Sequence, residues 1–390
     1  MQIQFVDQSQ ARSKLLPLTY TRPVADLRVG ILKIHEKWMK TLQASSYGYD
    51  TEPYLSRKFS SCESPTLFIY DGLMPNPKTV TAIKSLPAKT KLVQNEEVLA
   101  STATLDACEN VVAFSGEINK IVYSWDIFSQ NGVEIKSDFD LLIEGRISQP
   151  IEDPYTRTYG DQIFLEKGAK IKAAILNAES GPIYIGADTE VGEGAIIRGP
   201  FALCEHSVVS MAAKIRSATT VGPYSKVGGE VSNSVIQGYS NKGHDGFLGN
   251  SVLGEWCNLG ADTNNSNLKN NYTNVKMWDF ENNRFQDTGL QFCGLIMGDH
   301  SKCGINTMFN TGTTVGVSSN IFGEGYPRNI IPSFSWGGAS GFTTYKLNKV
   351  CEVAELVMGR RQVDFNEIEK DILAHISEIT ADQRIWEKEG

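Results

Sequence analysis

The chain has 390 residues, of which 41% are hydrophobic and 21% are charged, and its formal net charge is −8 at pH 7. This length allows two or three domains with cores of their own. The negative charge argues against a nucleic-acid-binding or anionic-membrane-binding surface, so we expect neither a nucleic acid nor a membrane as a partner.

Targeting signals and disulfides are not indicated by the sequence. No stretch approaches 18 consecutive apolar residues, and the start, MQIQFVDQSQ, lacks the basic and apolar regions of a secretory signal. The seven cysteines are scattered and free of C-x-x-C spacing, which argues against a disulfide framework and a zinc site. We therefore expect a reducing, cytoplasmic location.

The N-terminal part, residues 1–145, has the pattern of an α/β domain. Residues 31–42 place Ile31, Ile34, Trp38 and Leu42 at helical spacing. Short apolar runs that suit strands occur at residues 3–6, 66–70, 91–93 and 111–114. Strands that alternate with helical stretches predict a sheet covered by helices.

The strongest pattern in the chain is a period of six residues in its C-terminal half. Eight consecutive positions at this spacing are branched aliphatic: Ile185, Val191, Ile197, Leu203, Val209, Ile215, Val221 and Val227. This period fits neither an α-helix nor a lone strand, but it is typical of a parallel β-helix in which three hexads close one coil. The aliphatic residue then points inward and stacks on its counterpart in the next coil. The period resumes at Phe247, Leu253 and Leu259, and again at Met297, Cys303, Phe309, Val315 and Ile321, so we place the β-helix at 162–345.

Segments of different composition flank and interrupt the β-helix. A connector rich in Pro and charge, residues 149–154, precedes it. A polar segment that is dense in Asn at its start, residues 264–291, interrupts it. In the tail, residues 346–390, apolar side chains return at helical spacing, which predicts C-terminal helices.

The six-residue register breaks at residues 241–249 (NKGHDGFLG), and His244 lies in this break. An exposed histidine has a pKa near neutrality and can act as a general base toward an attacking amine or hydroxyl. The alternative is a loop histidine that holds a turn, and the residues alone leave both interpretations open.

Two blocks of the β-helix, residues 243–249 (GHDGFLG) and 258–267 (NLGADTNNSN), carry a family resemblance. With them, the stretch from about 214 to 325 resembles the acetyltransferase domain of the bifunctional N-acetylglucosamine-1-phosphate uridylyltransferase family, which is a left-handed β-helix trimer. The resemblance implies acetyl-CoA as co-substrate and a homotrimer.

The same resemblance implies individual roles. His244 would deprotonate the hexosamine amine, Asn258 would contact the sugar, and Asn267 would help to orient sugar and base. The backbone of Ala261 would meet acetyl-CoA.

The phosphate side of the site resembles the family less closely. Phe247 stands where the family has a tyrosine near the sugar phosphate, and Arg216 best matches the arginine that faces this phosphate. Arg198 looks similar but lies a coil too early, and a solvated corner residue is the alternative for either arginine. Asp262 replaces a glycine of the second block, and residues 229–232 (GEVS) offer no counterpart to the family's sugar-phosphate lysine. We therefore expect an acceptor other than glucosamine-1-phosphate.

Residues 15–23 (LLPLTYTRP) are similar to the R-L-x-P-L-T-x-x-x-P-K segment of sugar-phosphate nucleotidyltransferases. In that family the loop covers a nucleoside triphosphate whose charge Mg²⁺ neutralises. Here no Gly-rich loop precedes the segment, and Val24 stands in the place of its lysine. Arg22 and Arg28 remain candidates for a nucleotide site. The alternative is a structural ion pair between Arg22 and Asp26.

Taken whole, the chain resembles a branch of sugar nucleotidyltransferases related to the bifunctional family. The leading hypothesis is acyl transfer from acetyl-CoA to a sugar phosphate or nucleotide sugar, with nucleotidyl transfer as a second activity. One alternative is a nucleotidyltransferase that uses the β-helix for assembly. Another is a catalytically degenerate protein that binds a nucleotide sugar.

Overall fold

The computed structural model describes residues 1–387, which form two compact units. The first unit comprises Met1–Leu27 and Leu32–Ser124, and the second comprises Arg28–Ile31 and the chain from Trp125 onward. The predicted first domain, residues 1–145, is longer than the first unit, because the helix α4 (Asp126–Ile143) and the four residues Arg28–Ile31 belong to the second unit.

The first unit is an α/β structure built on a mixed sheet. Its strands are ordered β2-β1-β3-β6-β5-β7, and β3 and β6 run antiparallel while β1 pairs in parallel with both of its neighbours. The unit as a whole contains the strands β1 (Gln2–Val6), β2 (Ser46–Asp50), β3 (Leu67–Tyr70), β4 (Gly72–Met74), β5 (Thr90–Gln94), β6 (Glu97–Ser101), β7 (Asn110–Ala113) and β8 (Asn119–Ile121). Its helices are α1 (Ser9–Lys14), α2 (Ile34–Leu42) and α3 (Pro77–Lys84), with 3₁₀ turns at Val24–Asp26, Pro53–Leu55 and Leu105–Ala107.

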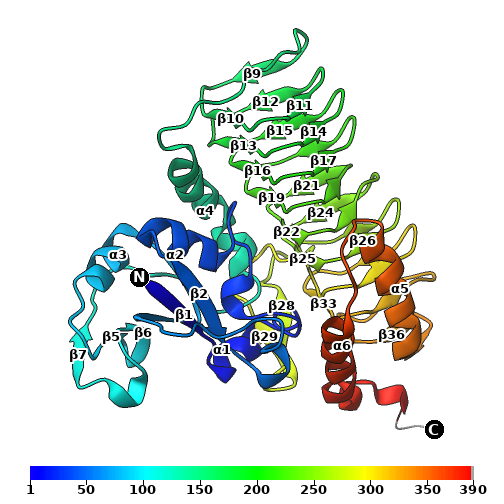
Figure 1. Ribbon diagram of the computed structural model, residues 1–390. Coiled ribbons are helices and arrows are strands. Elements are labelled where there is room, and N and C mark those ends of the chain that lie inside the picture. Colours follow the sequence, from blue (N-terminus) through cyan, green and yellow to red (C-terminus); the bar gives the residue numbers. More distant parts are fainter. Residues whose placement is uncertain (388–390) are drawn as a thin grey trace. The chain divides into compact units, whose positions relative to one another are not determined.

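The second unit is a parallel β-helix, whose coils form the green-to-yellow ladder of Figure 1. The first sheet contains β10 (Ile163–Leu165), β13 (Ile183–Ile185), β16 (Phe201–Leu203), β19 (Thr219–Val221), β22 (Val235–Gly238), β25 (Val252–Glu255), β30 (Leu295–Met297), β33 (Thr313–Val315) and β35 (Ile330–Ile331). The second contains β11 (Lys170–Ile171), β14 (Glu190–Val191), β17 (Val208–Val209), β20 (Lys226–Val227), β23 (Asn241–Lys242), β26 (Asn258–Leu259), β31 (Lys302–Cys303), β34 (Asn320–Ile321), β36 (Ser335–Gly338) and β37 (Gly341–Thr344). The third contains β9 (Arg157–Tyr159), β12 (Ile175–Asn177), β15 (Ile196–Arg198), β18 (Lys214–Ile215), β21 (Glu230–Ser232) and β24 (Phe247–Gly249), and β27 (Asn264–Asn265) pairs separately with β32 (Met308–Phe309).

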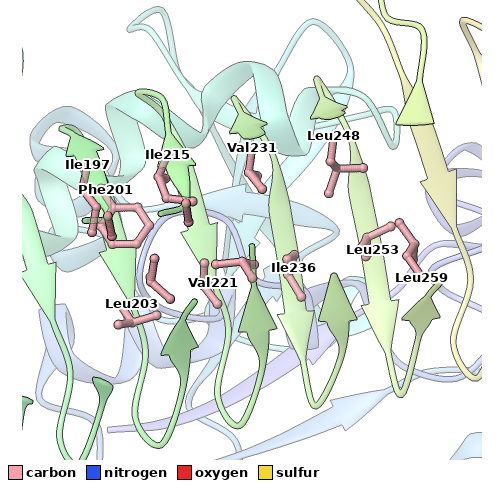
Figure 2. Packing of buried hydrophobic residues seen from close by; sticks show 14 of the residues in the cluster. Ile197, Phe201, Leu203, Ile215, Val221, Val231, Ile236, Leu248, Leu253 and Leu259 are labelled. Carbon is pink, nitrogen blue, oxygen red and sulfur yellow. The ribbon is translucent and has the colours of Figure 1, made fainter. Parts of the chain in front are cut away.

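The core of the β-helix is the predicted aliphatic stack. All eight residues of the first hexad run are at most 2% exposed. Neighbouring coils place them in register, as Leu203 beside Val221 and Val221 beside Ile236, and Figure 2 shows these side chains pointing into the coil. The predicted fold class is therefore confirmed.

The prediction that Phe247 points inward, as the first member of the second six-residue run, was wrong. Phe247 faces outward, and its neighbour Leu248 is the core residue, 1% exposed and in register with Val231. The reason is that the step from Leu248 to the next core residue, Leu253, is five residues rather than six. A shift of one residue turns a strand side chain to the opposite face.

One corner of the β-helix carries a stack of aromatic rings where glycine is the usual residue. Five successive coils place a ring at a corner residue with φ between 54° and 62°: His206, Tyr224, Tyr239, Trp256 and His300. Neighbouring ring centroids are 4.3 to 6.3 Å apart, and the ring planes are within 25° of parallel. Stacking thus offsets the steric cost of the left-handed backbone at these corners.

The polar interruption is a hairpin that packs on the β-helix. Its strands β28 (Lys276–Asp279) and β29 (Arg284–Asp287) are antiparallel. Val275 and Met277 are at most 1% exposed. Gly312 leaves room for the hairpin backbone, because a Cβ there would lie 2.3 Å from the carbonyl oxygen of Lys276.

The tail is helical, as predicted. It contains α5 (Leu347–Gly359) and α6 (Glu367–Ile379), followed by 3₁₀ turns at Ala381–Gln383 and Ile385–Glu387. The indole Nε1 of Trp386 donates to Thr344 Oγ1 at 2.9 Å, which ties the last turn to β37. Within residues 1–387, no helix is long and apolar enough to cross a membrane.

Candidate functional site at one corner of the β-helix

His244 lies at the corner between the second and third sheets. β23 ends at Lys242 and β24 begins at Phe247, so residues 243–246 form the turn between them. The side chains of His244 and Asp245 are exposed. The fold therefore presents the candidate base on the outside of the coil.

Lys242 holds this turn from inside, and sequence reasoning missed it. It pairs with Val227 of the preceding coil, so it occupies an inward core position, and it is only 1% exposed. Its Nζ donates to the carbonyl oxygens of Gly228 at 3.3 Å, Asp245 at 3.1 Å and His244. Burial lowers the pKa of Lys242 to about 8, although the carboxylates of Asp245 and Asp262 act in the opposite direction. A lysine at an aliphatic position of the repeat was the signal that could have revealed it.

The corner of the next coil, residues 260–263, stacks directly on this turn. The backbone N–H of Asp262 donates to the carbonyl oxygen of Asp245 at 3.0 Å. Gly246 has a φ of 114°, and a Cβ there would lie 2.2 Å from the carbonyl oxygen of Thr263. Gly246 therefore allows the two corners to approach, and Ala261 lies in the neighbouring corner as a half-buried residue.

Phe247 and Asn267 meet over Gly249. A Cβ on Gly249 would lie 2.5 Å from the Phe247 ring and 2.7 Å from Nδ2 of Asn267. The amide of Asn267 also donates to Oδ1 of Asn250 at 2.8 Å. Two of the predicted site residues are thus brought together on the outer surface of β24.

Two further asparagines, which sequence reasoning noted only as part of a polar run, continue the hydrogen bonding of β24. Oδ1 of Asn265 accepts from the N–H of Gly249 at 2.8 Å, and its Nδ2 donates to the carbonyl of Gly249 at 3.0 Å. Oδ1 of Asn264 accepts from the N–H of Phe247 at 2.8 Å. These side chains replace a strand partner and fix the backbone that carries Phe247.

Arg216 lies on the third sheet, two coils before Phe247. It follows β18, whose Lys214 is in register with Glu230, which is in turn in register with Phe247. The Arg216 guanidinium forms an ion pair with Glu230 at 2.8 Å, with side-chain exposures of 66% and 28%. Arg216 and Phe247 therefore belong to the same outer surface, with Glu230 between their strands.

Asn258 lies on the second sheet, on the coil after His244. It is exposed and in register with Asn241 on one side and Lys302 on the other. The His244 turn follows Asn241 by way of Lys242. Asn258 and His244 therefore face outward on adjacent coils.

Arg22 and Arg28 are buried and belong to different compact units. The predicted ion pair is present, with Nη1 of Arg22 at 3.3 Å from Oδ2 of Asp26, which also accepts from Lys33 Nζ at 3.0 Å. Arg28 is hydrogen-bonded through its backbone to the side chain of Gln237. A nucleotide role for either arginine stays a prediction.

The segment that resembles a nucleotidyltransferase loop is organised by Arg12, which sequence reasoning also missed. Its guanidinium donates to Asp7 at 2.8 Å, to the carbonyl oxygen of Arg22 at 3.1 Å and to that of Thr19. Burial raises the pKa of Asp7, while the charge of Arg12 acts to lower it. Among residues 1–387, no group of three or more His, Cys, Asp or Glu side chains is placed to hold a metal ion.

Known proteins resemble parts of the chain. Residues 3–147 match the family described as sugar nucleotidyl transferase. An uncharacterized acetyltransferase, YaiX, of Escherichia coli O6:K15:H31 is 27% identical over 159 residues, which are 40% of this chain and 68% of that protein. The bifunctional sugar-1-phosphate nucleotidylyltransferase/acetyltransferase of Sulfurisphaera tokodaii is 30% identical over 36% of this chain and 35% of its own length. The bifunctional protein GlmU of Methanocaldococcus jannaschii is 34% identical over 22% of this chain and 21% of its own.

The chain thus spans about a fifth to a third of these two bifunctional relatives. The resemblance predicted from the sequence motifs is confirmed. A solved structure of Arabidopsis UDP-N-acetylglucosamine acyltransferase aligns with 57% of this chain and 80% of its own, at 13% identity and a TM-score of 0.20.

Proposed function

We propose that the β-helix unit transfers an acyl group from acetyl-CoA to an amine or hydroxyl of a sugar phosphate or nucleotide sugar. The observation that supports this most directly is the exposed His244 on a turn whose backbone is held by Lys242. Amide side chains that suit a sugar, those of Asn258 and Asn267, flank this turn on the adjoining coil.

His244 acts as the general base in this proposal. Its neutral imidazole takes the proton of the acceptor amine or hydroxyl as the nucleophile attacks the thioester carbonyl. The tetrahedral oxyanion is stabilised by backbone N–H groups, for which the corner at Ala261 is the candidate. The carbon–sulfur bond then breaks, and the thiolate of coenzyme A leaves and is protonated.

The outer surface of the third sheet is proposed to bind the acceptor. Phe247 offers an aromatic face beside the amide of Asn267, and Arg216 offers a cation. Residues 229–232 offer no counterpart to the phosphate-binding lysine of the related enzymes, and Glu230 of this stretch pairs with Arg216. We therefore expect the acceptor phosphate to compete with Glu230 for this arginine, which makes glucosamine-1-phosphate a weaker acceptor than in those enzymes.

A homotrimer is part of the proposal. Each site would then be formed by the outer surfaces of two neighbouring coils of one subunit and by a second copy of the chain. Measurement of the mass in solution tests this directly. A monomer that is fully active would contradict a site shared between subunits.

The first unit is proposed to transfer a nucleotidyl group, with Mg²⁺ at the phosphates. The match of residues 3–147 to sugar nucleotidyl transferases favours this second activity. Release of pyrophosphate from a nucleoside triphosphate and a sugar-1-phosphate would support it. Saturable binding of a nucleotide sugar without turnover would instead support the non-catalytic alternative.

The acyl-transfer proposal is tested by thiol release from acetyl-CoA with a panel of amino-sugar phosphates and nucleotide amino-sugars. The wild type is compared with His244→Ala and with the control His206→Ala, which removes an exposed histidine from another corner. We expect turnover to fall at least ~100-fold in His244→Ala and to persist in His206→Ala. Equal turnover in both variants would remove His244 from the mechanism.

A further inference from the structure

Lys242 is a charged residue inside an aliphatic column of the β-helix. The inward residues of the second sheet before it are Ile171, Val191, Val209 and Val227, and after it come Leu259, Cys303 and Ile321. Each of these neighbours contributes apolar surface to the core. Among the coils within residues 1–387, only the one that carries His244 has a lysine at this position.

The burial of this ammonium group is unfavourable in itself. Transfer of an unpaired ammonium from water to a protein interior costs several kcal/mol, so a buried lysine persists only when its protons are accepted. Lys242 has three protons and three carbonyl acceptors: Gly228, His244 and Asp245. Two of the three belong to the His244 turn, and the third lies on the coil beneath it.

We infer that Lys242 is a positioning residue whose buried ammonium fixes the backbone of the His244–Asp245 turn and so sets the place of the His244 imidazole. This inference rests on the proposed acyl transfer. Lys242 is 1% exposed and its protons are engaged with backbone carbonyls, so it does not touch the substrate. It acts through His244, at a position where an apolar side chain would suit the core better.

The lysine could serve either the core or the site, and these two roles predict opposite effects of its replacement on stability. A residue kept for the core should destabilise the fold when it is replaced. A charge kept for the site should be replaceable by a hydrophobic residue of similar length without loss of stability, because the desolvation of the ion is relieved. Activity and the order of the turn should then decline although the fold is as stable as before.

The test compares Lys242→Met with Leu259→Met, which changes the same column one coil later. Three quantities are measured on the full chain: the midpoint of thermal unfolding, the amide hydrogen exchange of residues 243–247, and kcat and KM for acetyl-CoA. For Lys242→Met we expect an unchanged or higher midpoint, and exchange at least ~10-fold faster in the turn. We also expect kcat to fall at least ~10-fold while KM changes less than ~3-fold. Leu259→Met should leave kcat and the exchange of the turn as in the wild type.

Two outcomes would overturn the inference. One is exchange of residues 243–247 in Lys242→Met that equals the wild type. The other is a loss of midpoint and activity that is the same in both variants, which would make Lys242 an ordinary core residue. If the wild type transfers no acyl group to any acceptor, the proposed function fails, whereas the exchange measurement still decides whether Lys242 holds the turn. Lys242→Leu serves as a second variant if Lys242→Met does not fold.

Discussion

Gln237 and the backbone of Arg28 are joined by two reciprocal hydrogen bonds. The N–H of Arg28 donates to Oε1 of Gln237 at 2.7 Å, and Nε2 of Gln237 donates to the carbonyl of Arg28 at 3.0 Å. Both residues are buried, at 1% and 5% exposure. The amide side chain of Gln237, in β22, thus pairs with the Arg28 backbone as a neighbouring strand would, which helps to explain why Arg28–Ile31 belongs to the second unit.

Replacement of Gln237 by leucine should destabilise the second unit. Two buried backbone groups of Arg28 would lose their partners, at a cost on the order of 3 kcal/mol. Denaturant unfolding monitored by circular dichroism measures this. Gln149→Leu is the control, because it makes the same chemical change at an exposed position. Equal effects of the two substitutions would contradict the role given to Gln237.

The aromatic stack should make Tyr239 sensitive to the identity of its replacement. Its ring centroid lies 5.1 Å from that of Tyr224 and 4.3 Å from that of Trp256, on a backbone with a φ of 54°. Tyr239→Ala loses both ring contacts and keeps the left-handed strain, so we expect a loss on the order of 2 kcal/mol. Tyr239→Gly should recover about 1 kcal/mol of this loss, because glycine adopts positive φ freely.

Tyr239→Phe keeps the ring and is the control for the stack. Chemical unfolding of the three variants ranks them, and we expect phenylalanine to be the most stable and alanine the least stable. A glycine variant less stable than the alanine variant would mean that backbone strain is not stored at this corner.

The repeat could be predicted from the sequence because one local property, an aliphatic residue every six positions, is repeated on many coils. The deviations from this six-residue period could not be predicted. The steps from Val227 to Val231 and from Leu248 to Leu253 are shorter than six residues, and only the closed coil shows that Leu248 rather than Phe247 turns inward. A periodic pattern indicates the repeat but not the place where a coil is shortened.

The candidate site was predictable to a different degree. His244 and Asn258 became candidates by resemblance, since they belong to short contiguous motifs, and their roles stay predictions. Lys242 and Asn265 were missed because their roles depend on what the next coil places beside them. Residues Arg28–Ile31 were missed as part of the second unit, because their partners lie more than 100 positions away in the sequence.

The buried Lys242 should make stability depend on pH in a defined direction. Its pKa is lowered from 10.5 to about 8 in the folded chain, so the folded state disfavours the charged form. Between these two values the unfolded chain binds more protons, and the contribution of Lys242 to the free energy of unfolding therefore rises with pH. Its total is on the order of 3 kcal/mol, present as a cost below about pH 8 and removed as the pH approaches 10.5.

The difference between wild type and Lys242→Met isolates this contribution from the cysteines and tyrosines that titrate in the same range. We expect Lys242→Met to exceed the wild type in stability most strongly at pH 7 and to lose this advantage by pH 10. Denaturant unfolding at both pH values measures the difference. A difference that is independent of pH would show that the lysine is not desolvated in the folded chain.

The ion pair of Arg216 with Glu230 should matter for the acceptor and not for the fold. Because the Arg216 side chain is 66% exposed, the pair should contribute little to stability, and Arg216→Ala should leave the unfolding midpoint nearly unchanged. If this guanidinium binds the acceptor phosphate, Arg216→Ala should raise KM for the acceptor about 10-fold, because a charge-assisted hydrogen bond is lost. Glu230→Gln should act in the opposite direction and lower this KM several-fold, because it releases Arg216 from a competing carboxylate.

Steady-state kinetics at two salt concentrations test both expectations, since an electrostatic contribution to acceptor binding weakens as salt increases. Arg198→Ala, an exposed arginine one coil earlier on the same sheet, is the matched control and should leave KM for the acceptor unchanged. A Glu230→Gln variant that binds the acceptor more weakly would assign the contact to Glu230 itself and place the phosphate elsewhere.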